Sequence, residues 1–400
     1  MDRFLQDYFE QVAEICTECG ICSRAQVAAG CPAGEYGPFA RTMLSEGASG
    51  DYSEKTVHAL FSCALCGECT AACPVGIDAA EFTRFARADY LDRHPEHGDG
   101  YRAMQTDLKE NVFSRLLREQ CIEYPDALVG EGVQGAGGKS LFFPGCTLAA
   151  YAPELTMAVF DYLVETGEAD GMTALCCGNP LRGIGLARRY ARYSRLLAGR
   201  FERQGIDRVV VACPNCYYAL QEMQEDGIIP AGIDIACLPE VLADRGMRIA
   251  DGLPDSLVES FAVHDSCPDR KDLRFARAVR RLLPEKSLVC EMRHVGTNVI
   301  CCGSGGMVSF YDPAACVARR ERRLAEFDES GADCLVTECI SCSNSMRRGD
   351  ASAPAFHYLE LLFGVRIDWD GFLQAQVRLD AHGGYAFHSP DDGAPVLSEG

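Results

Sequence analysis

The sequence predicts a multidomain α+β protein, with an all-helical N-terminal domain followed by two tandem α/β domains. Three observations support this class. A five-cysteine pattern occurs twice between residues 140 and 370, which indicates a duplicated structural unit. Within each copy, short apolar runs alternate with helical patterns, as in α/β layers. The first 127 residues instead carry two cysteine triplets among helical patterns, with few residues that favour strands.

The expected domain boundaries follow these changes in pattern and a glycine-rich stretch that is typical of a linker. We expect a helical domain at 1–127, a linker at 128–139, α/β domains at 140–250 and 257–370, and a C-terminal tail at 371–400. The tail carries no motif, so we expect either a loose extension or a strap that binds a partner.

Composition narrows the class of protein. Hydrophobic residues make up 48% of the chain and charged residues 24%, which is typical of a globular protein. The net charge of −20 argues against nucleic acid or an anionic membrane as the main partner. No apolar run approaches the roughly 20 residues that span a bilayer, and residues 1–16 do not resemble a signal peptide. These residues have the spacing of an amphipathic helix, and we favour a packing helix over a membrane anchor.

The chain contains 23 cysteines. In a reducing compartment, clustered cysteines are metal ligands rather than disulfide partners, and an odd number fits poorly with a complete disulfide framework. We therefore expect a cytoplasmic protein with metal sites, either free or held at a membrane by a partner subunit.

The N-terminal region carries two C-x-x-C-x-x-C triplets. The second triplet, closed by Cys73-Pro74, has the cysteine spacing of bacterial ferredoxins, in which three thiolates bind one 4Fe–4S cluster and the fourth cysteine binds the other. By this rule one cluster is held by Cys16, Cys19, Cys22 and Cys73, and the other by Cys63, Cys66, Cys69 and Cys31. Eight residues separate Cys22 from Cys31 where the pattern has three. A pair of structural zinc sites is the alternative, and the triplet spacing with two Cys-Pro closures disfavours it.

Secondary structure is expected as follows. Helices in the first domain are expected at Phe39–Leu44, Lys55–Phe61, Ala79–Leu91 and Tyr101–Glu119. Strands in the two α/β domains are expected at Leu141–Phe143, Thr173–Leu175, Val209–Ala212 and Ile233–Ala236, and at Phe261–His264, Val299–Ile300 and Cys334–Thr337. Helices between them are expected at Pro153–Gly167, Leu186–Gln204, Tyr217–Asp226, Leu273–Leu283, Pro313–Glu329 and Ser343–Arg348.

The duplicated pattern is a lone cysteine, a vicinal pair followed by glycine, and a C-x-x-C pair. The first copy is Cys146, Cys176, Cys177, Cys213 and Cys216, and the second is Cys267, Cys301, Cys302, Cys339 and Cys342. The cysteines fall at or just after expected strand ends, where α/β folds bind ligands. Glycines such as Gly178, Gly303, Gly305 and Gly306 let backbone N–H groups approach sulfur. Adjacent cysteines suit a mononuclear zinc site poorly, and vicinal disulfides are strained, so we favour cluster ligation.

This pattern resembles the CCG domain of heterodisulfide reductase catalytic subunits. Over about residues 10–365, the whole chain resembles the fused D-type subunit. It is also similar to the iron–sulfur subunits of anaerobic glycerol-3-phosphate, glycolate and lactate dehydrogenases and of thiol:fumarate reductase. The resemblance implies that each five-cysteine set binds a 4Fe–4S cluster of the non-cubane type, in addition to two cubane clusters in the ferredoxin region. It also implies that a disulfide is cleaved between the two CCG-bound clusters, with the ten cysteines at the active site.

Two functions follow from the resemblance. The first is an oxidoreductase subunit that passes electrons through the ferredoxin clusters to CCG-bound clusters, which reduce a disulfide or a similar acceptor. The second is a relay between a flavoprotein dehydrogenase and a quinone or a membrane cytochrome. Gly183 and Gly185 lack the third glycine of a dinucleotide-binding motif, so electrons are expected from a flavoprotein or another donor subunit. A zinc-stapled scaffold is a third, minor alternative.

Several residues outside the motifs have a structural and a functional interpretation. For Cys121, Cys237, Cys290, Cys316 and Cys334 we favour packing. His264 and Asp265 directly precede the second lone cysteine, and a hydrogen bond beside the cluster is favoured over proton delivery. His357 is expected to begin a core helix, with a role as ligand or proton donor as the alternative. The arginines at 182–203 and 270–281 are expected on solvated faces that pair with acids, with an anionic substrate or docking surface as the alternative.

Overall fold

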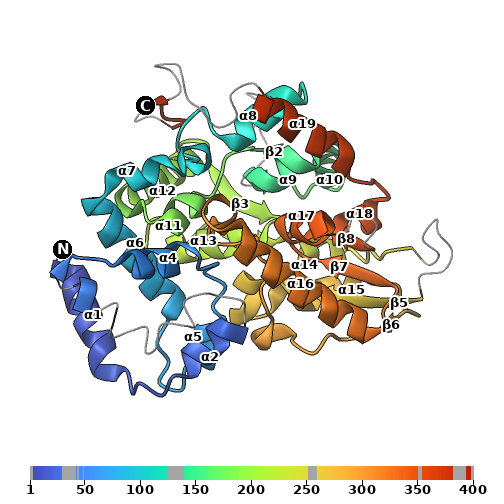
Figure 1. Ribbon diagram of the computed structural model, residues 1–400. Coiled ribbons are helices and arrows are strands. Elements are labelled where there is room, and N and C mark those ends of the chain that lie inside the picture. Colours follow the sequence, from blue (N-terminus) through green and yellow to red (C-terminus); the bar gives the residue numbers. More distant parts are fainter. Residues whose placement is uncertain are drawn as a thin grey trace.

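The computed structural model describes residues 3–28, 42, 45–47, 49–124, 139–250, 259–349, 354–381 and 393–397. Along these residues an N-terminal helical region precedes two segments that each contain a four-stranded parallel sheet (Figure 1). The predicted α+β multidomain class is confirmed. No helix among the described residues is long and apolar enough to cross a membrane.

The N-terminal region packs around one apolar core. Its helices are α1 (Arg3–Ile15), α2 (Ile21–Ala28), α4 (Glu54–Phe61), α5 (Glu68–Ala72), α6 (Ala79–Arg93), α7 (Pro95–Asp99), the 3₁₀ turn η2 (Arg102–Met104) and α8 (Val112–Glu119). Helix α1 buries Leu5, Phe9 and Val12, which lie on one helical face. This agrees with the packing helix predicted there. The helix expected at Phe39–Leu44 falls almost wholly outside the described residues.

The first α/β segment has the strand order β2-β1-β3-β4, with all strands parallel. Its elements are β1 (Lys139–Phe143), α9 (Cys146–Tyr151), α10 (Pro153–Glu165), β2 (Gly171–Met172), α11 (Asn179–Ile184), α12 (Ala187–Arg203), β3 (Ile206–Val211), α13 (Pro214–Glu225), β4 (Asp234–Cys237) and α14 (Leu238–Asp244).

The second segment repeats this topology with the order β6-β5-β7-β8, again all parallel. Its elements are β5 (Ser260–His264), η3 (Cys267–Lys271), α15 (Arg274–Leu282), β6 (Leu288–Val289), η4 (Gly296–Asn298), η5 (Val308–Phe310), α16 (Pro313–Ser330), β7 (Cys334–Thr337), α17 (Ile340–Gly349), β8 (Ala355–His357) and α18 (Tyr358–Phe363). The matching strand order supports the duplication that the cysteine pattern predicts.

The two sheets share a core. Side chains alternate between the two faces of a strand, so Phe142 and Val210 point to one face of the first sheet and Leu141 to the other. Phe142 and Val210 belong to the same buried cluster as Phe261 and Val263 of the second sheet. Helices α10, α14, α15 and α18 contribute further apolar side chains to this cluster. The inner faces of both sheets are therefore covered by one continuous apolar layer.

Two expected strands are wrong. Thr173–Leu175 follows the short strand β2 instead of forming it, and Val299–Ile300 lies in a loop. Both residues of the second run are buried, so their apolar character reflects packing under neighbouring elements and not a sheet. Strand β6 lies at the edge of its sheet, and both of its residues are exposed. Its sequence therefore lacks the pattern of a buried strand. The short strand β8 was not expected.

The single helix expected over Tyr101–Glu119 is also wrong. A 3₁₀ turn, η2, is followed by a loop, and α8 begins only at Val112. The Asn111 side chain accepts hydrogen bonds from the N–H groups of Phe113 and Ser114, and the Ser114 hydroxyl accepts one from the Asn111 N–H. This capping box fixes the start of the helix.

The expectation of a loose C-terminal extension is wrong for the described residues. Helix α19 (Trp369–Ala381) packs beside α8 (Figure 1), and it buries Phe372, whose ring centroid lies 4.3 Å from that of Tyr151. Farther on, the Val396 N–H donates to the Asp107 carbonyl (2.8 Å), and Leu397 is buried. These contacts are apolar packing and backbone pairing, which leave no motif in the sequence.

Candidate metal centre

Four cysteines predicted to bind the first ferredoxin cluster line one cavity. Its volume is ≈ 50 Å³, and it lies where the end of α1, the start of α2 and the loop after α5 meet. The cysteines in its wall are Cys16, Cys19, Cys22 and Cys73, with Cys69 of the second triplet beside them. Apolar side chains such as Val12 and Phe82 close the cavity. The donor set and its apolar wall suit a thiolate-bound cluster.

In the second triplet, Cys63 and Cys66 lie on the turn between α4 and α5, and Cys69 lies in the first turn of α5. Leu65 and Gly67 within this turn have φ of +53° and +73°, and the Leu65 N–H donates to Cys63 Sγ (3.4 Å). These left-handed residues bend the chain tightly around Cys66. Cys31, the fourth predicted ligand of this cluster, lies outside the described residues.

In the first α/β segment the five cysteines form one continuous group. Cys146 Sγ lies 3.5 Å from Cys176 Sγ. The side chain of Cys177 lies close enough to those of Cys176 and Cys216 to interact with them, and Cys216 interacts in the same way with Cys213. All except Cys146 are buried. Five thiols held together in this way would give, as thiolates, a set of soft anionic ligands of the kind that binds an iron–sulfur cluster.

Glycine geometry permits this convergence. Gly145 has φ +83°, and a Cβ there would lie 3.0 Å from both Cys213 Cβ and Cys216 Sγ. The β1–α9 loop can therefore pass directly over the thiols only because this position has no side chain. The Gly178 N–H donates to Cys176 Sγ (3.4 Å), as expected for thiolates stabilised by backbone donors.

The five cysteines of the second segment form a matching group. The side chain of Cys302 lies close enough to those of Cys301 and Cys342 to interact with them, and Cys342 interacts in the same way with Cys339. Cys267 lies close enough to Cys302 for their charges to interact. The Gly303 N–H donates to Cys301 Sγ (3.2 Å), as Gly178 does in the first segment. Unlike the others, the Cys301-Cys302 doublet follows a loop and not a strand end.

His264 lies beside this second group. One of its ring nitrogens and the Sγ atoms of Cys302 and Cys342 lie within 4.8 Å of one another. Its Nδ1 accepts a hydrogen bond from Arg323 Nε (2.8 Å). Burial and the Arg323 charge lower the pKa of His264 to about 3, so its ring is neutral. Asp265 points elsewhere, toward Arg280 (2.7 Å).

His357 ends β8 and begins α18, as a core residue. It is 2% exposed, and its Nε2 lies 3.3 Å from the Glu338 carbonyl oxygen. Burial lowers the pKa of His357 to about 4. The ring therefore sits next to the Cys339 loop without joining the group of thiols.

The two five-cysteine groups meet. Cys213 of the first and Cys339 of the second lie close enough for their side chains to interact, and both are buried. The Asn215 side chain also reaches toward Cys339 Sγ (3.9 Å). The two groups therefore face each other across one buried junction.

The ferredoxin triplet also reaches the second group. Cys66 packs against the buried cluster that contains Cys301, and the two thiols lie close enough to interact. The loop after the doublet lies against the triplet turn, because a Cβ at Gly305 would lie 2.5 Å from the Ala64 carbonyl oxygen. A Cβ at Gly306 would lie 2.4 Å from the Cys63 carbonyl oxygen. These glycines, expected to serve their own cluster, instead permit contact between domains.

A buried arginine that the sequence did not single out anchors this contact. Arg87 of α6 is 0% exposed. Its guanidinium group donates to four backbone carbonyls. Nε donates to Leu60 (2.9 Å), Nη2 to Cys63 (2.6 Å), and Nη1 to Gly306 (3.0 Å) and Gly183. One side chain thus joins the helical domain to both α/β segments. A charged residue inside an apolar helical pattern was the signal that could have revealed it.

Of the arginine clusters noted in the sequence, many residues pair with acids as expected. Arg182 lies 2.9 Å from Glu81, and Arg189 lies 2.7 Å from Asp107. Arg270 is different, because it donates to the Cys66 carbonyl (3.3 Å) at the domain contact. These pairs connect the α/β segments to the helical domain.

The five cysteines outside the motifs have different surroundings. Cys237 and Cys334 lie in apolar cores, in agreement with the packing interpretation. Cys316 packs partly buried beside Val308, and Cys290 is half-buried. Cys121 is exposed, so packing is wrong for this residue, which lies at the end of α8 where the chain leaves the helix.

Comparison with known proteins assigns two domain types. Residues 12–77 match the 4Fe-4S dicluster domain, and residues 140–221 and 261–347 match the CCG cysteine-rich domain. The chain is similar to the D-type subunit of dihydromethanophenazine:CoB–CoM heterodisulfide reductase of Methanosarcina barkeri, with 23% identity over 78% of each chain. The corresponding protein of Methanosarcina acetivorans is 23% identical over 74% of each chain. An uncharacterized iron-sulfur protein of Methanococcus maripaludis is 24% identical over 72% of this chain and 57% of the relative.

Proposed function

Because the chain carries a 4Fe-4S dicluster domain and two CCG cysteine-rich domains, and is homologous to the D-type subunit of heterodisulfide reductase, we propose that it reduces a disulfide within a larger redox complex. The matched domains and the similar proteins support, in general terms, an iron–sulfur electron-transfer subunit. The proposal adds the substrate class and the place of the reaction.

The observation that carries the proposal is the junction of the two five-cysteine groups at Cys213 and Cys339. A disulfide has two sulfur atoms, and a site built from two facing thiolate groups suits a substrate that separates into two sulfur-containing halves. Both groups retain all five cysteines. The donor sets, the glycine at 145 and the backbone N–H donors fit a sulfur-rich iron cluster in each group.

The chain's own residues give an order to electron delivery. A 4Fe–4S cluster supplies one-electron redox chemistry when bound. Cys66, a predicted ligand in the ferredoxin region, touches Cys301, a predicted ligand in the second group. Electrons from a reduced partner, which we propose to be a flavoprotein or another iron–sulfur subunit, would enter by this contact. Reduction of the substrate breaks one S–S bond, takes two electrons and two protons, and gives two thiols.

The test is anaerobic purification, iron and sulfide analysis, and EPR spectroscopy during titration with small disulfides and thiols. Four clusters correspond to about sixteen irons per chain. A new paramagnetic signal on addition of a thiol or disulfide under mild oxidation supports the proposal. The Cys176→Ala/Cys177→Ala variant should lose this response and keep the signals of the ferredoxin region, and Cys237→Ala should keep both.

One observation favours a second function, a relay between a flavoprotein dehydrogenase and a quinone or cytochrome partner. Cys213 and Cys339 are only 7% and 2% exposed, so a substrate reaches their junction only if the surrounding loops open. A relay needs no such opening. Full iron content with no spectral response to any thiol or disulfide would favour the relay and reject disulfide reduction.

A further inference from the structure

The two α/β segments differ at one matched position beside their cysteines. Phe143 and His264 each lie three positions before the lone cysteine of their pattern, and each is the last residue of the equivalent strand, β1 or β5. Both are buried. Phe143 belongs to the apolar core of the first segment. The second segment therefore has an imidazole where the first has a benzene ring.

A second difference lies on the helix that packs behind each group. Leu197 on α12 is sixteen positions before Cys213, and Arg323 on α16 is sixteen positions before Cys339. Both are 0% exposed. The buried residues of α12 carry no charge, whereas α16 buries Arg323 and Glu326. Of these two helices, therefore, only the one behind the second group contains a buried ion pair.

The contacts of Arg323 orient it toward the cysteines. Its Nε donates to His264 Nδ1 (2.8 Å), and its Nη1 donates to the His294 carbonyl (2.8 Å) and to Glu326 (2.8 Å). Its Nη2 has no hydrogen-bond partner among the described residues. The charge of Arg323 is close enough to interact with that of Cys342.

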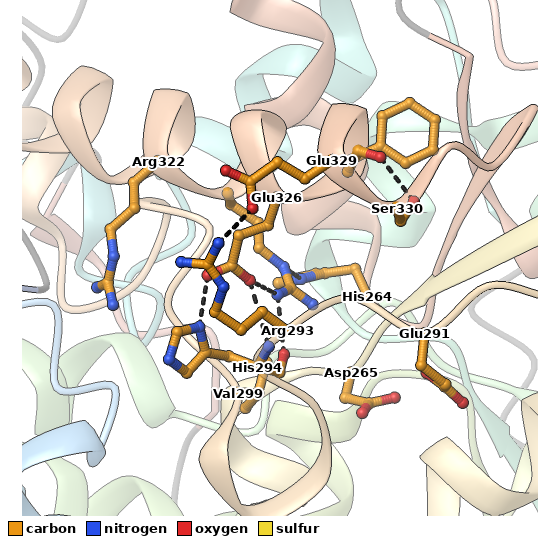
Figure 2. Close-up of polar contacts among 12 residues, drawn as sticks. His264, Asp265, Glu291, Arg293, His294, Val299, Arg322, Glu326, Glu329 and Ser330 are labelled. Atoms are coloured by element: carbon orange, nitrogen blue, oxygen red, sulfur yellow. Dashed lines mark hydrogen bonds and ion pairs between the residues drawn. The ribbon is translucent and has the colours of Figure 1, made fainter.

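Glu326 lies on the other side of this arrangement. Its second oxygen is paired with His294 Nδ1 at the half-exposed edge of the network (Figure 2). The positive end of the ion pair therefore reaches His264 and Cys342, and the negative end points to His294. In a low-dielectric interior such a dipole acts strongly on nearby charge.

We propose that Arg323 and His264 make the second five-cysteine site the better electron acceptor, with a higher reduction potential than the first site. A buried guanidinium stabilises added negative charge. Arginine has no acceptor, so the neutral His264 ring receives its hydrogen bond at Nδ1 and carries its own hydrogen on Nε2. Hydrogen-bond donors and positive charge near cluster sulfur set the reduction potential. Phe143 and Leu197 supply neither to the first site.

The higher reduction potential proposed for the second site agrees with the place where electrons would enter the two groups. Cys66 touches the second group, at Cys301. The site that receives single electrons is then the site that holds them, until a second electron arrives for a two-electron reaction. The inference rests on the proposed cluster at each group, and it does not depend on a disulfide being the substrate.

The test is an EPR-monitored redox titration of the iron-loaded chain without substrate. The signal of the second site is identified by its loss in Cys301→Ala/Cys302→Ala. His264→Phe copies the first segment and leaves the ion pair intact. Arg323→Met/Glu326→Gln removes both charges together, because removal of one partner leaves a buried unpaired charge. Arg293→Met is the matched control, since Arg293 is 66% exposed in the same region, where it pairs with Glu329 (Figure 2).

Both variants should shift the midpoint of the second site to a lower potential, with the first site and the Arg293→Met control unchanged. An unchanged second midpoint at full iron content would overturn the proposal, as would an equal shift of both sites. Loss of about four irons in His264→Phe would instead make His264 a ligand, which also overturns it. A missing response to disulfides rejects only the proposed function, because these midpoints are measured without substrate.

Discussion

The side chains of Cys66 and Cys301 pack together across the boundary between the helical domain and the second α/β domain. Each is a predicted ligand of a different cluster. Their contact depends on the close approach of two backbones, at Gly305 and Gly306 on one side and Cys63 and Ala64 on the other. The geometry of this approach can be tested directly.

Gly306→Ala should destabilise the chain more than Gly331→Ala. Both glycines have positive φ, +62° and +67°, so both substitutions cost about 1 kcal/mol in backbone strain. A Cβ at Gly306 would also lie 2.4 Å from the Cys63 carbonyl oxygen, whereas a Cβ at Gly331 meets nothing within 4 Å. The clash adds about 1–3 kcal/mol. Anaerobic denaturant unfolding measures both, and equal losses would mean that the two loops do not touch.

Arg87→Met should lower the free energy of unfolding by about 3–5 kcal/mol, because it leaves several buried carbonyl oxygens without a donor. Arg188→Met is the matched control. Arg188 is 84% exposed and pairs with Asp92 at the surface, so its loss should cost less than about 1 kcal/mol. If the two variants unfold at the same denaturant concentration, Arg87 does not join the domains.

Substitution of a proposed ligand cysteine should lower the iron content of the chain, whereas substitution of a packing cysteine should not. Cys213→Ala removes a proposed ligand and should reduce iron by about four atoms per chain. Cys237→Ala, which changes a cysteine 1% exposed in an apolar core, should retain all the iron and lose only about 1–2 kcal/mol of stability. Iron and sulfide analysis of anaerobically purified protein distinguishes them. Iron loss in Cys237→Ala would make that residue a ligand.

Phe372→Ala should destabilise the chain by about 3–5 kcal/mol, as expected for a buried aromatic residue. Phe372 is 1% exposed and lies against Tyr151. The neighbouring Leu373 is 42% exposed, so Leu373→Ala should cost less than about 1 kcal/mol. The comparison is made by thermal unfolding under argon. Similar values for both would show that α19 is not docked in solution.

The sequence carried enough information for the repeated architecture. The spacing from Cys146 to Cys177 nearly equals that from Cys267 to Cys302, and the two sheets have the same strand order. Lone cysteines could be placed at strand ends because β1 and β5 are buried apolar runs. Strands of two residues, such as β2 and β6, are too short to leave a periodic signal.

The contacts between domains could not be predicted in the same way. The approach of Cys66 to Cys301 depends on how separate domains pack, and no spacing within one motif encodes it. Arg319 and Arg323 lie inside a predicted helix, and both are buried on one face of α16. Two arginines four positions apart lie on the same side of a helix, which was the available signal. Their burial depends on acceptors supplied by other segments.

The apolar layer shared by the two sheets bears on how such a chain could arise. A single α/β segment on its own would leave Phe142, Val210 and their neighbours facing water, a patch of the kind that drives association. A pair of identical copies would cover this patch through a symmetric contact. Gene duplication and fusion would then have kept an existing dimer interface, and afterwards each copy was free to diverge. The difference between Phe143 and His264 at equivalent strand ends is one that a symmetric dimer of identical chains cannot have, because both copies then carry the same residue.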